Sequence, residues 1–326
     1  MTQTNVKKSK DNALRRLLRT DEFSVFIPLL AIVLITTIFR PDFLTVSNFA
    51  AMFTQIPFIA IVALGVCFPL MTGNIDISTG KIAGFAGIMM ASMAYEHGWD
   101  IGWALLIGLL CGVAIGAING ILVVHVGLPA FIATMGTQYM VGGARYLFIH
   151  GYQLNIQNSL VDFFNLRIAG MLPYFWIMVI LYVIVFIVIK FTLWGRRIRA
   201  VGDNAEVASL AGINVKKMKL VAYVLAGFFS AIAGILITLD LGYGLPENGD
   251  GWEFRAIAGC VVGGVSLSGG KCSPLGIIIG VTMIQVADSD IIFLGMPNTM
   301  RVAVQGALMA LAVLFDIFRQ SRKVAA

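Results

Sequence analysis

Five long apolar runs without a charged residue constrain what this chain can fold into. A helix needs about 20 apolar residues to cross a bilayer, with about 17–25 the usual range. The runs that qualify are Phe23–Phe39, Phe49–Thr72, Ile101–Val124, Ile168–Ile189 and Leu220–Leu239. Only 12% of the residues are charged and 59% are hydrophobic, whereas soluble domains carry about 25% charged residues. The sequence therefore excludes a water-soluble enzyme and predicts an all-α, polytopic membrane protein.

Weaker apolar runs raise the expected number of transmembrane helices to about ten, all in one domain spanning residues 23–318. These runs are Ser78–Tyr95, Leu128–Ile149, Ala256–Gly270, Cys272–Ala287 and Thr299–Phe318. Leu128–Ile149 qualifies if Arg145 faces the protein interior or lies at the outer end of the helix. Two of the weaker runs, Ala256–Gly270 and Cys272–Ala287, form a glycine-rich pair, and each is too short for an upright crossing. The pair predicts either half-membrane helices beside a translocation pathway, where broken helices are tolerated, or two short tilted spans.

Basic residues gather in three stretches, which are the tail 1–22, the loop 194–219 and the tail 319–326. Membrane proteins accumulate lysine and arginine on the cytoplasmic side. Six predicted spans separate the first stretch from the second, and four separate the second from the third. Both numbers are even, so all three stretches, including both termini, are expected in the cytoplasm. The net charge of +6 thus reflects topology and does not indicate nucleic-acid binding.

Glycines at four-residue spacing predict close helix packing. Gly108, Gly112, Gly116 and Gly120 form one groove on a single helix, into which a neighbouring backbone can fit. Gly276 and Gly280 repeat the spacing once.

A short amphipathic helix is expected inside the loop 194–219. Asp203 and Glu206 have the spacing of a capping box, and Gly212 supplies a C-terminal stop. Between them, Val207, Leu210 and Ala211 form an apolar stripe. A helix of about eight residues does not persist alone in water. It must therefore dock either on its own membrane domain or on a cytoplasmic partner.

Polar residues at membrane depth are the candidates for function. Asn74, Asp76 and Ser78 interrupt two predicted spans, and a carboxylate inside a bilayer is costly enough to suggest a functional role. Alternatively, Asp76 and Ser78 cap the helix that begins near Thr79. On the apolar helices, Asn119, Gln138 and Gln285 favour interhelical hydrogen bonds over solute contact.

The sequence does not match the motifs of an ATPase, an intramembrane serine protease or a metal site. Neither Gly80-Lys81 nor Gly270-Lys271 is followed by Ser or Thr, so the chain has no phosphate-binding loop. All three histidines precede Ser266, the possible nucleophile of an intramembrane protease. The four cysteines show no metal-ligand spacing. We expect no catalytic residue, cofactor or metal.

Four blocks of residues resemble the ribose-type permeases of ABC importers, within the branched-chain amino acid and sugar permease superfamily. They are Gly73-Asn-Ile-Asp-Ile-Ser-Thr-Gly80, Gly116-Ala-Ile-Asn-Gly120 with Leu128-Pro-Ala-Phe-Ile-Ala-Thr-Met-Gly136, the loop Gly195–Asn214, and Trp252–Ala258 with Gly263–Gly270. The blocks occur in the order typical of that family, from about residue 45 to 318. Asn74, Arg255, Cys272 and the stretch Asp288-Ser289-Asp290 depart from its usual pattern.

The resemblance implies a type II importer-like permease in a bacterial plasma membrane. It would carry a sugar or a sugar-like solute and work with cytoplasmic ATPase subunits, an extracytoplasmic solute-binding protein and a second permease, identical or different. Asp203–Gly212 would be the helix that couples to the ATPase, through Asp203, Asn204, Glu206, Val207, Leu210 and Gly212. The pathway residues would be Asn74, Asp76, Ser78, Asn119 and Glu253.

Two other classes of protein remain open from the sequence. A stand-alone secondary transporter would use Asp76 or Asp240 as a proton or sodium site. A structural membrane scaffold would carry no solute. The solute itself is not predicted.

Overall fold

The computed structural model describes residues 33–34, 36–38, 40–149, 153–156 and 158–293, and single positions between 303 and 314. Its elements in chain order are η1 (Pro41–Leu44), α3 (Val46–Met71), α4 (Thr79–Tyr95), α5 (Ile101–Ile121), η2 (Leu122–Val126), α6 (Ala130–Leu147), β1 (Leu154–Asn155), α7 (Ser159–Phe164), α8 (Pro173–Phe191), α9 (Leu193–Asp203), α10 (Ala205–Leu210), α11 (Val215–Leu241), β2 (Tyr243–Gly244), α12 (Trp252–Val262) and α13 (Pro274–Phe293). Among the described residues, the strands β1 and β2 form a single antiparallel pair. The fold is all-α, as predicted.

Four helices are long and apolar enough to cross a membrane, over Asn48–Met71, Ile101–Val126, Pro173–Phe191 and Val215–Leu241. They confirm four of the five charge-free runs, although α8 begins at Pro173 rather than Ile168. The run Leu128–Ile149 forms α6, and Ser78–Tyr95 forms α4. Most of Phe23–Phe39 and of Thr299–Phe318, with both basic tails, lies outside the described residues. The count of ten spans therefore stays a prediction.

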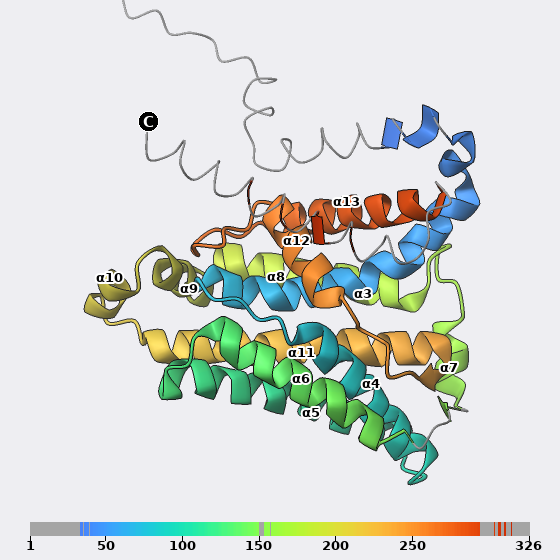
Figure 1. Ribbon diagram of the computed structural model, residues 1–326, viewed down its shortest axis with the longest axis horizontal. Helices are drawn as coiled ribbons and strands as arrows, with labels where there is room; N and C mark the ends of the chain where they lie inside the picture. Colours follow the sequence, from blue (N-terminus) through green and yellow to red (C-terminus); the bar gives the residue numbers. More distant parts are fainter. Residues whose placement is uncertain are drawn as a thin grey trace, which may run out of the picture.

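The long helices run side by side, with α9 and α10 at one end of the bundle and α7 at the other (Figure 1). α11 packs against α3, α4 and α5, while α8 packs against α3. In the most apolar stretch of α3, 78% of the residues are buried, against 28% in α5 and in α8. The helix α3 is therefore central, and α5 and α8 lie at the rim with apolar side chains turned outward.

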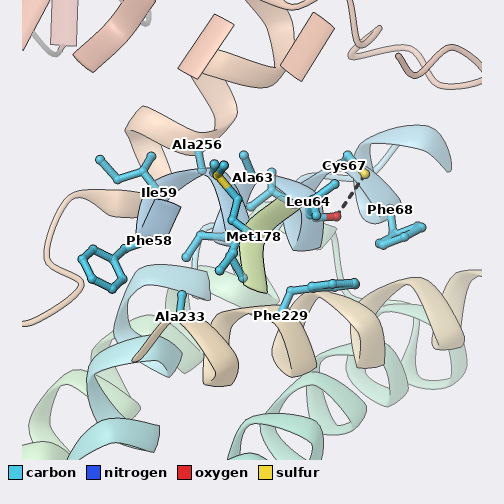
Figure 2. Close-up of a cluster of buried hydrophobic side chains, with 14 of the residues drawn as sticks. Phe58, Ile59, Ala63, Leu64, Cys67, Phe68, Met178, Phe229, Ala233 and Ala256 are labelled. Carbon is cyan, nitrogen blue, oxygen red and sulfur yellow. Dashed lines mark hydrogen bonds between the residues drawn. The ribbon is translucent and has the colours of Figure 1, made fainter. Parts of the chain in front are cut away.

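Aromatic side chains of α3 form the centre of the core (Figure 2). The ring of Phe68 stacks on Phe229 of α11 at 5.9 Å between centroids. At the middle of α3, Phe58 stacks on Trp252 at 6.0 Å, which attaches the first residue of α12 to the core. The Tyr182 hydroxyl of α8 donates to the carbonyl oxygen of Ala60 at 2.9 Å. α8, α11 and α12 are thus all held against α3.

Irregular backbone joins several of the helices. It includes residues 72–78 between α3 and α4, the segment from the end of α11 to the start of α12, and residues 263–273 between α12 and α13. α12 has 11 residues, or about 16 Å at 1.5 Å per residue, roughly half of a 30 Å hydrocarbon core. This confirms a half-length helix in the first of the two glycine-rich runs. The second run lies in α13, whose apolar part Pro274–Ser289 is shorter than the four membrane-spanning helices, so the choice between a half-membrane helix and a short tilted span stays open there.

The glycine grooves mediate helix packing, as predicted. A methyl group built on Gly116 of α5 would collide with the carbonyl oxygen of Tyr223 and approach the backbone of Gly227, both on α11. Likewise, Gly276 and Gly280 of α13 fit against the backbone of Gly263 and Gly259 at the end of α12. Backbones can approach this closely only where side chains are absent.

We therefore expect Gly116→Ala to destabilise the bundle by about 1–3 kcal/mol, because the contact is backbone against backbone and cannot relax by a side-chain movement. The apparent unfolding midpoint of the purified protein in detergent would fall by about 2–4 °C per kcal/mol. The matched control is Gly136→Ala on α6, where the added methyl meets no described atom within 4 Å. Equal midpoints for the two variants would contradict this packing.

Candidate functional site

The loop 194–219 is mostly helical, and its short helix begins one residue later than the capping-box prediction. Asp203 is the last residue of α9, and Asn204 caps α10. The Asn204 side-chain oxygen accepts from the backbone N–H groups of Glu206 and Val207, each at 3.0 Å. The capping box of Asp203 and Glu206 was therefore wrong, and the expected helix of about eight residues has six.

The end of α10 is formed by a glycine, as predicted. Gly212 has a φ of +79°, which favours glycine because it lacks a Cβ. The N–H of Gly212 donates to Ser209 at 2.9 Å, and the N–H of Ile213 donates to Ala208 at 3.0 Å. This pair of hydrogen bonds is a Schellman motif, and it fixes the turn between α10 and α11.

The apolar stripe of α10 is open to solvent. Leu210 is 89% exposed and Val207 is 60% exposed, whereas Ala208, on the other side of the helix, is buried. Hence α10, which lies with α9 at one end of the bundle (Figure 1), rests on α9 and α11 with its small side chain buried and its large ones exposed. Docking of Val207 and Leu210 on the membrane domain, the first alternative above, does not occur in this structure.

α9 connects α10 to two of the irregular stretches, residues 72–78 and residues 263–273. Gly202, next to its C-terminus, is surrounded so closely that an added methyl would collide with the Met71 carbonyl oxygen and the Gly270 backbone nitrogen. Gly270 in turn donates its N–H to Met71 at 3.0 Å. Met71 is the last residue of α3, and Gly270 lies between α12 and α13. A displacement of α9 therefore acts directly on both places.

A buried hydrogen-bond chain holds the break between α3 and α4. One oxygen of Asp76 accepts from the Ser78 N–H at 2.9 Å and from the Ser78 hydroxyl at 2.6 Å. The Asn119 amide of α5 donates to the Ser78 hydroxyl at 2.8 Å. All three residues are 0% exposed. Neither side chain caps α4 directly, because Ser78 is its N-cap residue without a capping hydrogen bond and Asp76 accepts from Ser78, which precedes the helix.

The remaining polar candidates are not part of the hydrogen-bond chain of Asp76, Ser78 and Asn119. Asn74 is half-buried and donates to the carbonyl and hydroxyl oxygens of Thr72, at 3.1 and 3.0 Å. Gln285 of α13 donates to the Gln55 amide oxygen of α3 at 3.4 Å, an interhelical contact of the expected kind. Glu253, in the first turn of α12, accepts from Gln138 of α6 at 2.9 Å.

A cluster of charged residues near Glu253 was not recognised from the sequence. One oxygen of Asp250 lies 2.7 Å from the Lys81 ammonium and 2.9 Å from the Arg145 guanidinium. Arg145 is 1% exposed, which confirms its predicted interior position. The available signal was that Ser78–Tyr95 and Leu128–Ile149, both weak spans, each carry one internal basic residue, Lys81 or Arg145.

Two departures from the family pattern face each other. The guanidinium of Arg255 on α12 lies 3.1 Å from the carboxylate of Asp288 on α13. The Asp288 side chain is 1% exposed and that of Arg255 is 11% exposed. The two unusual residues thus form one buried ion pair that joins the half-length helix to its neighbour.

Comparison with known proteins assigns the sequence to a family. The family model described as branched-chain amino acid transport system / permease component matches residues 48–313. The L-arabinose ABC transporter permease protein AraH of Azospirillum brasilense is 30% identical over 303 residues, which cover 92% of this chain and 87% of that protein. No solved structure matches the chain.

Two further relatives are similar over comparable lengths. The ribose import permease protein RbsC of Escherichia coli is 32% identical over 301 residues, 90% of this chain and 93% of that protein. The autoinducer 2 import system permease protein LsrC of an Enterobacter species is 29% identical over 310 residues, 94% of this chain and 90% of the relative. Together with the apolar helices and the breaks between them, these matches establish that the chain belongs to the branched-chain amino acid transport system permease family and is a multi-pass membrane protein.

Proposed function

We propose that this chain forms the membrane pathway of an ABC importer for a sugar or a sugar-like solute, driven by ATP hydrolysis on a separate subunit. The observation that carries the proposal is α10, a capped helix whose Leu210 is 89% exposed and which is connected through α9 to the breaks in the bundle. Relatives named as L-arabinose, ribose and autoinducer 2 permeases support the solute class. They also favour this function over a stand-alone ion-coupled transporter.

The proposed orientation places α9, α10 and both termini in the cytoplasm. Lysine and arginine are concentrated in the tails and in the segment 194–219, as expected for cytoplasmic segments. The end of the bundle with α7 and the strand pair then faces the extracytoplasmic binding protein. A second permease, identical or different, completes the pathway between the two protomers.

The proposed mechanism transmits force through rigid contacts. A cleft on the ATPase holds the apolar stripe of α10, with the cap of Asn204 and the turn at Gly212 keeping the helix rigid. Closure of the ATPase moves α10 and α9 together, because α10 packs on α9 with its Ala208 side chain buried. The tight contact at Gly202 then shifts Met71 and Gly270. These positions adjoin the α3–α4 break and the α12–α13 turn, so access to the pathway changes from one side to the other.

Leu210→Asp tests the coupling function of α10. The side chain is 89% exposed, so the fold is kept, but an unpaired carboxylate in an apolar contact costs more than about 1.4 kcal/mol, which predicts at least about a tenfold loss of ATP-driven uptake. Solute-stimulated ATP hydrolysis would be lost in parallel. Uptake is measured in vesicles containing the complete importer, with Leu210→Met as the control that keeps an apolar contact. Normal uptake by Leu210→Asp would reject the coupling assignment.

Asn119→Leu tests whether the buried hydrogen-bond chain of Asp76, Ser78 and Asn119 only stabilises the fold or also takes part in transport. Loss of the amide leaves the Ser78 hydroxyl without its donor and destabilises the fold by about 1–3 kcal/mol. If Asn119 also contacts solute, as its place among the pathway candidates Asn74, Asp76, Ser78, Asn119 and Glu253 requires, the uptake rate per folded molecule falls as well. An unchanged rate per folded molecule would remove Asn119 from the pathway and leave it a positioning residue.

A further inference from the structure

The charged cluster of Lys81, Asp250 and Arg145, with Gln138 and Glu253 beside it, lies near the middle of the bundle. Gln138 is the ninth of the 18 residues of α6, so each end of that helix is about 12 Å away at 1.5 Å per residue. Glu253 is bonded to Gln138, and its carboxylate abuts Gly80, where an added methyl would collide with it. Because α6 runs most of the width of a hydrocarbon core, Gln138 and Glu253 lie near mid-membrane depth, while Arg145 reaches the cluster from the last turn of α6.

One side of this cluster is left open by the residues that the structure describes. The Asp250 side chain is 43% exposed and that of Lys81 is 20% exposed. The stem of Lys81 passes alongside Gly142 of α6. Charged groups at this depth face a watery cavity or the interior of an assembly, because exposure to lipid is costly. An irregular backbone such as that around Asp250 is tolerated at this depth under the same condition.

The charged groups of the cluster are already paired with one another, whereas several hydrogen-bonding atoms remain unused. Lys81 and Arg145 share the Asp250 carboxylate, so a charged solute would have to disrupt an existing ion pair. Within the described part of the chain, Glu253 Oε2, Asn248 Nδ2 and Arg145 Nε are buried without a hydrogen-bond partner. An acceptor and two donors within one cluster suit hydroxyl groups, each of which can both donate and accept.

We infer that Lys81, Asp250 and Glu253 form a binding site for an uncharged, hydroxyl-rich solute halfway along the pathway. Lys81 and Asp250 make the first contact, and the unused atoms of Glu253 and Asn248 become available when the start of α12 moves. The inference rests on the proposed function, and it shifts the expected solute contacts from the buried Asp76 chain to the open side of α4.

Aqueous thiol labelling tests the site without knowledge of the natural solute. Asp250→Cys and Lys81→Cys are prepared in the complete importer in vesicles, and both are exposed to a charged methanethiosulfonate reagent that does not cross lipid. The matched control is Val183→Cys, at the middle of α8 and 52% exposed on the rim of the bundle. We expect the cluster cysteines to react at least about tenfold faster, because only a hydrated thiol forms the reactive thiolate readily. Labelling as slow as that of Val183→Cys would overturn the inference.

Protection from labelling then tests the solute class. We expect millimolar D-ribose or L-arabinose to slow the reaction of Asp250→Cys, whereas glutamate at the same concentration does not. Protection by glutamate alone, or by neither sugar, would contradict a site for hydroxyl-rich solutes. ATP-driven uptake by the unaltered importer is measured in the same vesicles. Its absence would contradict the proposed function, whereas uptake with unlabelled cluster cysteines would contradict only the site.

Discussion

Backbone groups that leave helical geometry inside a membrane must find partners within the protein, because lipid offers none. Residues 72–78 and the segment before α12 are such places, and buried polar side chains hold both. Asp76 and Asn119 stabilise the first, while the second is attached by Arg145, whose guanidinium reaches the Asn248 carbonyl at 3.2 Å. This requirement explains why the chain buries polar residues at points where a simple bundle would have apolar ones.

Tight backbone contacts with α9 make two irregular stretches, residues 72–78 and residues 263–273, responsive to movement of that helix. Gly202 brings the end of α9 into backbone contact with Met71 and Gly270, and neither contact contains a flexible side chain that could absorb a displacement. Packed interiors transmit strain because they have few voids. α10, in contrast, exposes its large apolar side chains, Val207 and Leu210, on the surface. The protein thus combines a rigid internal connection with an open docking helix.

How much of this could be predicted depended on whether a feature is local in sequence. Hydrophobic runs, glycine spacing and the stop at Gly212 are local, and they gave the long helices, the grooves and the end of α10. The α9 helix was taken for a loop because its basic residues hide its buried face at Gly195, Ile198 and Val201. Missing α9 also moved the cap from Asn204 to Asp203. The cluster of Lys81, Arg145 and Asp250 joins three distant segments, so no local pattern could reveal it.

The central claim is that α10 receives its force from an ATPase subunit, and contact at Leu210 tests it most directly. A photo-crosslinking amino acid in place of Leu210, in the importer isolated from its own membrane, would be irradiated and its crosslinked peptide identified by mass spectrometry. The account predicts a crosslink to the ATPase subunit whose yield changes when ATP is added. A crosslink to the extracytoplasmic binding protein, or only to lipid or to this chain itself, would contradict it.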